Sequence, residues 1–208
     1  AEQSANLTST SAILASLAKN LPDALFSPAL SGNHRRRTMS RPDLHPWTLD
    51  PVEAVRVQAS LRERLVLTWD GRAVSTIAGI DVGLKDASRT ARAAIVVLRY
   101  PDLTPLEGVT ANTPLVFPYV PGLLAFREGP AILAAWERLH LQPDLLMFDG
   151  QGIAHPRGIG IAAQMGLWLD RPSIGVAKSR LYGRHAAPGP RRGDLADLVD
   201  ERDTARVI

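Results

Sequence analysis

The sequence predicts an α/β domain with one mixed five-stranded sheet, in which an antiparallel meander passes into parallel strands flanked by helices. Three strand-like runs follow one another with short connections, at residues 75–80, 91–100 and 106–115. This spacing is typical of an antiparallel meander. Helical and strand-like runs then alternate, at residues 131–139, 145–148, 159–167 and 173–177. Because a strand–helix–strand crossover makes its two strands parallel, we expect the last strands to be parallel.

A helix is expected to precede the sheet and to begin at Asp50. Asp50 is a suitable N-cap, Pro51 fits the first turn, and Glu53 stands where it would complete a capping box. The helix would bury a stripe of apolar residues at helical spacing, namely Ala54, Val57, Leu61 and Leu65.

The two later helices also show an apolar face. In the first, the residues expected to face the core are Ile132, Leu133, Trp136 and Leu139. In the second, helical spacing is kept by Ile159, Ala162, Ala163, Gly166 and Leu167. Three residues of this second face are alanine or glycine, so we expect this helix to pack very close to the sheet.

Composition narrows the class of protein. A chain of 208 residues fits one domain with a full core. It has no cysteine, which excludes disulfides and thiolate metal sites. No apolar run approaches a membrane span and no secretory signal is evident, so we expect a cytoplasmic protein without a membrane partner. The net charge of +3 suits a polyanionic partner, but it is equally consistent with an ordinary solvated surface.

The first 38 residues differ from the rest of the chain. They are rich in serine, asparagine, alanine and threonine, and they end in a basic run at residues 34–37. We expect residues 1–38 to be a disordered or non-native extension, with a functional basic arm as the alternative. Residues 39–208 would then form the folded domain.

Two aspartates stand where nuclease chemistry would need them. Asp81 and Asp149 each follow a short apolar run, and glycine follows each within two residues. Carboxylates at the ends of buried strands can hold Mg²⁺ against a phosphate, and glycine lets a nucleic-acid backbone approach. Each residue alone is equally consistent with a turn aspartate that binds backbone amides.

Four further residues have a functional and an ordinary interpretation. Glu128 is either a third carboxylate or a charge near a helix start. His155 lies in a Gly/Pro loop, where histidine either transfers protons or forms surface hydrogen bonds. Lys178 is a catalytic cation or an extended surface lysine. Tyr119 lies between Pro118 and Pro121. Its ring either stacks on a nucleobase or packs against the protein.

Three motifs decide between these interpretations. They are PYVPGLLAFRE at residues 118–128, DGQGIAHPR at 149–157 and GVAKSRL at 175–181. In this order they resemble the endonuclease V family, over roughly residues 43–185. The resemblance implies a ribonuclease H-like fold. Family members continue with a further strand, a closing helix and one more active-site histidine, so we expect the C-terminal part of the domain to be missing here.

The resemblance assigns a role to each candidate. Asp81, Glu128 and Asp149 would hold Mg²⁺, with Mn²⁺ as an alternative, and His155 and Lys178 would assist catalysis. Tyr119 would act as a wedge where the damaged base leaves the duplex. The base pocket would be lined by Gly122, Leu124, Gly150, Gly152 and Leu181. Many relatives have histidine at the position of Gln151, which can still donate a hydrogen bond to phosphate.

The implied activity is a metal-dependent endonuclease in DNA repair. The family hydrolyses the second phosphodiester bond 3′ to a deaminated base, chiefly hypoxanthine, leaving 3′-hydroxyl and 5′-phosphate ends. The expected partner is single- or double-stranded DNA containing inosine, and the protein is expected to be a monomer. RNA containing inosine presents the same base and is an alternative substrate. Two alternatives are another ribonuclease H-like nuclease, such as a junction resolvase, and a catalytically weak nucleic-acid-binding fragment.

Overall fold

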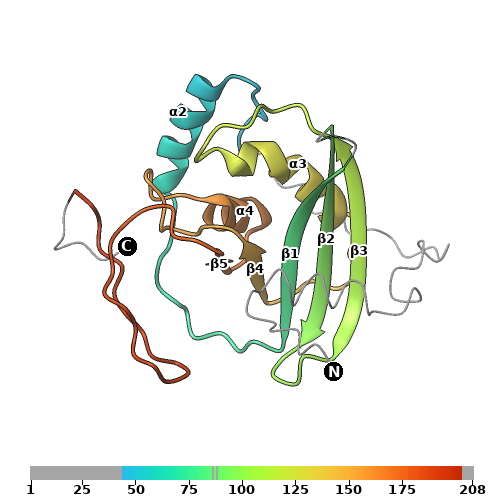
Figure 1. The fold of residues 1–208 in the computed structure, drawn as a ribbon. Coiled ribbons are helices and arrows are strands. Elements are labelled where there is room, and N and C mark those ends of the chain that lie inside the picture. Colours follow the sequence, from blue (N-terminus) through green and yellow to red (C-terminus); the bar gives the residue numbers. More distant parts are fainter. Residues whose placement is uncertain (1–43, 86, 88, 203–208) are drawn as a thin grey trace, which may run out of the picture.

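The computed structural model describes residues 44–202 except 86 and 88, so the expectations for residues 1–38 lie outside it. The strands are β1 (Thr76–Lys85), β2 (Thr90–Arg99), β3 (Pro105–Pro114), β4 (Leu145–Asp149) and β5 (Ser173–Val176). The helices are α2 (Pro51–Arg62), α3 (Leu124–Trp136) and α4 (Ile161–Leu169). The strands form one sheet in the order β3-β2-β1-β4-β5 (Figure 1).

The sheet is mixed, as predicted. β2 pairs antiparallel with both β1 and β3, whereas β4 pairs parallel with both β1 and β5. The parallel pairing of β1 with β4 ends at Ile80 and Phe148. Asp81 and Asp149 are therefore the next residues of two neighbouring strands, which brings both carboxylates to the same edge of the β1–β4 pair.

β1 is longer than its apolar run predicts. It continues to Lys85, so Asp81 lies within the strand and pairs with Ala94 of β2, whereas a strand-end position was expected. The antiparallel partner β2 sustains β1 after the parallel partner β4 has ended. From Asp81 onward β1 therefore has no pairing with β4, and Asp149 follows the last residue of β4 that pairs with β1.

The core lies between the sheet and the two helices α3 and α4. Residues of β1, β2 and β4 that point to this side, such as Ile80, Ile95 and Phe148, are at most 1% exposed. α4 packs as close as its small residues predict, because a methyl group at Gly166 would overlap the side chain of Ser173 at the start of β5.

α3 begins seven residues earlier than predicted. It starts at Leu124 and contains Pro130, where the sequence suggested a start near Ala131. Glu128 therefore lies inside the helix, not before it. The error has a plain cause: a Gly-Pro pair usually ends or begins a helix, yet here burial of Phe126 and Ala131 against the core holds the helix through it.

α2 begins as predicted but its cap is built differently. The Val52 amide donates to Asp50 Oδ1 at 2.8 Å, as expected of an N-cap. Glu53 does not close a capping box with Asp50. The Thr48 hydroxyl instead donates to Glu53 at 2.6 Å and accepts from the Asp50 amide at 3.1 Å. Thr48 thus takes the position between these two groups.

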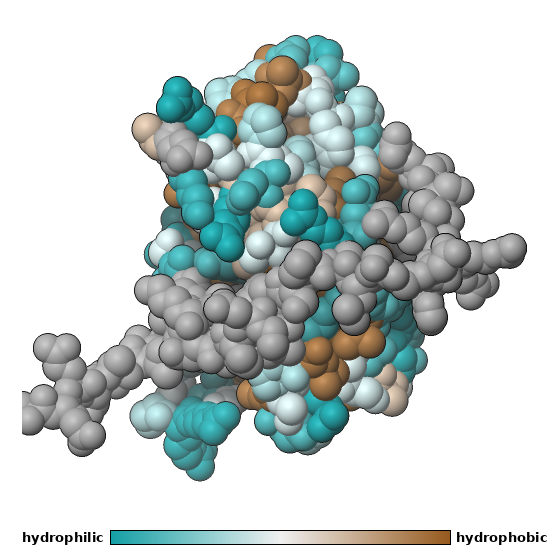
Figure 2. All heavy atoms as spheres, turned by 90° about the vertical axis from the view of Figure 1, so that its right-hand side faces the viewer, coloured by the Kyte–Doolittle hydropathy of each residue, from teal (hydrophilic) through white to brown (hydrophobic). Residues whose placement is uncertain are grey.

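α2 packs outside α3 and α4 (Figure 1). Ala54 contacts the cluster that contains Phe126 of α3, and Leu61 packs with Ile159 and Ala163 beside α4. No helix in the part of the chain that the structure describes has the length and apolarity needed to cross a membrane. On the face that Figure 2 presents, apolar residues form small separate patches among hydrophilic ones.

Candidate active site

Three carboxylates from three elements influence one another. They are Asp81 of β1, Glu128 of α3 and Asp149 of β4. Burial raises the pKa of Glu128 to about 8, and the negative charges of Asp81 and Asp149 add to the effect. Burial also raises the pKa of Asp81, again with a contribution from Asp149. Like charges raise each other's pKa only at close range, so the fold brings the predicted acidic residues together.

Lys178 joins this cluster from the segment after β5. Its Nζ lies 2.8 Å from Asp149 Oδ2, and this hydrogen bond raises the pKa of Lys178. The lysine side chain is 58% exposed, whereas that of Asp149 is only 13% exposed. Lys178 therefore reaches the carboxylates from solvent and brings a positive charge into direct contact with the cluster.

The donor chemistry of the cluster fits a hard divalent cation. Carboxylate oxygens are the ligands that Mg²⁺ and Mn²⁺ prefer. In the described residues, however, no three acidic, histidine or cysteine side chains already stand in a metal-binding arrangement. In this arrangement Lys178 contacts Asp149, and a Glu128 pKa of about 8 favours the neutral form of that side chain near pH 7.

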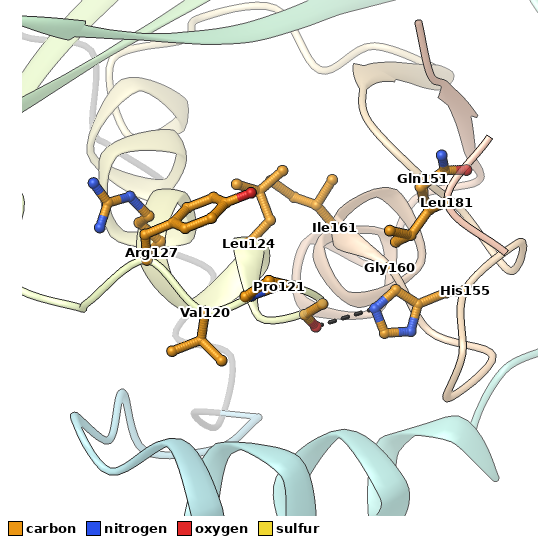
Figure 3. Close-up of a pocket in the computed structure, with 11 residues that line it drawn as sticks. Val120, Pro121, Leu124, Arg127, Gln151, His155, Gly160, Ile161 and Leu181 are labelled. Atoms are coloured by element: carbon orange, nitrogen blue, oxygen red, sulfur yellow. Dashed lines mark hydrogen bonds between the residues drawn. The ribbon is translucent and has the colours of Figure 1, made fainter. Parts of the chain in front are cut away.

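A pocket of about 160 Å³ is built from the same parts of the chain as the acidic cluster. Its walls are formed by Tyr119, Val120, Pro121, Gly122, Leu124, Arg127, Gln151, His155, Gly160, Ile161 and Leu181. Figure 3 shows Leu124 and Ile161 between Arg127 on one side and Gln151 and Leu181 on the other. The mostly apolar walls suit a flat, uncharged ring.

Three of the five predicted pocket residues line this pocket, namely Gly122, Leu124 and Leu181, and the predicted wedge Tyr119 lines it as well. Gly150 and Gly152 do not. A methyl group at Gly150 would meet Ile161, which is itself in the wall, and one at Gly152 would touch the backbone of Gly175. Gly150 therefore lets the loop after β4 pack closely behind the wall, whereas the position of Gly152 has room for a methyl group.

Arg127 and Gln151 are pocket residues whose contacts the sequence did not predict. The guanidinium of Arg127 lies 5.9 Å from the centre of the Tyr119 ring and donates to the Phe117 carbonyl at 2.7 Å. Gln151 donates to the carbonyl of Ser179 at 2.8 Å, which ties the two pocket loops together. In this structure the Gln151 amide is thus directed to backbone, not held free for a phosphate.

His155 is placed differently from the expected proton-transferring residue. It is 3% exposed, its Nε2 donates to the Gly122 carbonyl at 3.0 Å, and its Nδ1 accepts from the Arg157 amide at 3.1 Å. Burial lowers its pKa to about 4, so it stays neutral near pH 7. Because both ring nitrogens are engaged with backbone, the geometry favours a structural role in the pocket wall.

Pocket and acidic cluster share three chain segments. α3 carries Leu124 and Glu128, the β4 end carries Asp149 and Gln151, and the segment after β5 carries Lys178 and Leu181. A ring-sized pocket built on the same chain segments as grouped carboxylates and a lysine is an arrangement suited to a nuclease.

Comparison with known proteins agrees with this class. The family model for endonuclease V matches residues 59–208. The endonuclease V of Alkalilimnicola ehrlichii is 50% identical over 166 residues, which cover 79% of this chain and 73% of that protein. The crystal structure of endonuclease V from Streptomyces avermitilis superposes with a TM-score of 0.71 at 40% identity, covering 76% of this chain and 70% of that one.

A second similar structure contains nucleic acid. It is the Ciona intestinalis endonuclease V (D234N) in complex with a 23mer DNA containing an inosine followed by a ribo-adenosine, with a TM-score of 0.55 and 27% identity. The match covers 69% of this chain and 61% of that one. The present chain therefore belongs to the endonuclease V family and is a nuclease. It spans about 73% of the Alkalilimnicola relative.

Proposed function

We propose that this nuclease hydrolyses the second phosphodiester bond 3′ to a deaminated base, chiefly hypoxanthine, in DNA repair. The observation that carries the proposal is the shared construction of pocket and acidic cluster, because α3, the β4 end and the segment after β5 each contribute to both. A base bound in the pocket would hold its own strand against the carboxylates. The Ciona relative, solved with inosine-containing DNA, supports this choice of substrate.

Asp81, Glu128 and Asp149 would hold a divalent cation, Mg²⁺ or Mn²⁺. Such an ion activates water and stabilises negative charge that develops on phosphate. Binding would favour the ionised form of Glu128, whose pKa of about 8 reflects burial beside two other carboxylates. Lys178, which is bound to Asp149 but largely exposed, would then be available to neutralise a phosphate oxygen.

Tyr119 would fill the space that the extruded base leaves. Its side chain is among the exposed large residues, at 73%, and it borders the pocket. Arg127 supports the ring from behind through its contact with the aromatic face. A ring held on a proline-flanked loop can replace lost base stacking at a small entropic cost.

A nicking assay tests the proposal. The substrates are end-labelled duplexes with one inosine or with adenosine at the same position, and a matched RNA with inosine, each with Mg²⁺ or with EDTA. We expect a nick at the second bond 3′ to inosine in DNA that EDTA removes. Equal cleavage of both duplexes would contradict base selection, and cleavage of the RNA alone would move the substrate class to RNA. Binding of the duplex without any cleavage would contradict the proposed activity and indicate that this chain only binds nucleic acid.

A further inference from the structure

The backbone carbonyl of Gly122, in the pocket wall, receives hydrogen bonds from three side chains. Gln58 Nε2 donates at 3.1 Å, His155 Nε2 at 3.0 Å and Arg157 Nη2 at 2.6 Å. A carbonyl oxygen has two lone pairs and ordinarily accepts one or two hydrogen bonds. The Gly122 oxygen accepts three, and one of the donors is cationic. One peptide group of the pocket is therefore held from three directions.

Gln58 completes this arrangement from outside the pocket. It lies on α2, is 1% exposed, and accepts from Arg157 Nε at 2.6 Å through its amide oxygen. Because the Arg157 guanidinium only donates, the Gln58 oxygen must face it and the Gln58 nitrogen must face Gly122. A single amide thus orients Arg157 and contacts Gly122 directly.

Gly122 is a position where such support matters. It has a φ of +80° and immediately precedes Leu123, the N-cap of α3, in a loop that carries Tyr119 on one side and Leu124 on the other. No side chain of the loop itself caps the helix, since Leu123 has no polar group and no side-chain cap hydrogen bond is made. The amide side of the Gly122–Leu123 peptide is held within the loop, where the Leu123 amide donates to the Val120 carbonyl at 3.0 Å. Its carbonyl side is held by three side chains far away in the sequence.

We propose that Gln58 is a positioning residue that fixes the Gly122 carbonyl and thereby sets the selectivity of the pocket for its nucleobase. The inference rests on the proposed base-binding function. Gln58 touches neither the pocket space nor the carboxylates: it acts through Gly122 and Arg157. Its loss would loosen the loop from Tyr119 to Leu124 and leave the acidic cluster in place.

A matched control is available on α4. Gln164 is as buried as Gln58, at 0% exposed, and belongs to the same network through its contacts with Gln58 at 3.4 Å and His45 at 2.9 Å. The three side chains that donate to the Gly122 carbonyl do not include it. Gln58→Met and Gln164→Met each remove one buried amide of the same size, so general loss of stability should be similar in both.

The experiment compares these two variants with the unaltered chain. Steady-state cleavage is measured on inosine and undamaged duplexes, together with hydrogen exchange of the peptide covering residues 117–124. For Gln58→Met we expect the inosine preference in kcat/KM to fall roughly tenfold, the effect of one hydrogen bond, mainly through KM. Exchange in residues 117–124 should become faster. Gln164→Met should change neither quantity.

The outcomes separate this inference from the proposed function. Equal behaviour of the two variants, in selectivity and in exchange, would overturn the positioning role while the nuclease function stands. If the unaltered chain shows no inosine preference, the proposed function fails. The exchange comparison then still decides whether Gln58 holds the loop, and unchanged exchange in Gln58→Met overturns that as well.

Discussion

Lys178 Nζ lies 2.8 Å from Asp149 Oδ2 and so occupies one of the carboxylates that the proposed cation would need. The lysine and the cation are therefore expected to compete for Asp149. When the cation binds, Asp149 would hold it, and Lys178, whose side chain is 58% exposed, would be available to the scissile phosphate. Until then, the ion pair offsets part of the negative charge of the cluster.

Replacing Lys178 tests this competition. In Lys178→Met we expect the Mg²⁺ concentration for half-maximal cleavage to decrease, because the lysine no longer occupies Asp149. The maximal rate should decrease by one to two orders of magnitude, roughly the effect of losing one charged contact to the transition state. Titration of the cleavage rate with Mg²⁺ measures both, and an unchanged or higher requirement for Mg²⁺ would argue against competition.

Tyr119→Ala should affect base selection more than catalysis. The ring is exposed at the pocket mouth and contacts Arg127, not the carboxylates. The preference for inosine over undamaged DNA should fall by roughly 1–3 kcal/mol, the range for one stacked base. Single-turnover cleavage of both substrates gives the ratio. If the ratio equals that of the unaltered chain, Tyr119 only packs against the loop.

Acid should destabilise the fold through His155. Its pKa is lowered from 6.5 to about 4 by burial, so below pH 6.5 the unfolded chain binds a proton that the folded chain does not. Stability present above pH 6.5 is therefore lost as pH falls toward 4, by on the order of 2 kcal/mol at pH 5. His45, whose pKa burial also lowers, acts in the same direction.

Urea unfolding of the unaltered chain and of His155→Gln at pH 7 and pH 5 isolates this contribution, because Glu128, whose pKa is raised to about 8, acts in the opposite direction in both proteins. Relative to the unaltered chain, His155→Gln should be destabilised by less at pH 5 than at pH 7, by on the order of 2 kcal/mol. Equal destabilisation at the two pH values would mean that His155 is accessible to protons in the folded state, as the proton-transferring role would require.

The sequence predicted the mixed sheet because its elements follow local patterns. Apolar runs identified β4 with Asp149 at its end, and the order of helices and strands predicted that the last strands are parallel, as β4 and β5 are. Glu128 was assigned to the acidic cluster only through the family resemblance, because its own neighbourhood in the sequence is equally typical of a helix start. The contacts of Gln58 with Gly122 and Arg157 could not be predicted, since they span 64 and 99 positions and leave no periodic signal. The buried position of His155 could not be predicted either, because burial is a tertiary property.

Asp149 is the residue on which the proposed chemistry depends most, and Asp144, at the other end of β4, provides its matched control. The Asp144 side chain accepts from the Ser75 and Thr76 amides at 2.9 Å, and these bonds lower its pKa. Asp144 thus serves the structure of the sheet. Asp149→Asn keeps the shape of the side chain and removes the charge that would hold the cation.

The most direct measurement is therefore single-turnover cleavage of an inosine duplex at saturating Mg²⁺ by the unaltered chain, Asp149→Asn and Asp144→Asn, with binding of the same duplex measured in parallel. We expect Asp149→Asn to bind the duplex without cleaving it. Asp144→Asn should cleave at nearly the unaltered rate per folded molecule while unfolding at a lower temperature. Near-normal cleavage by Asp149→Asn would contradict the assigned site.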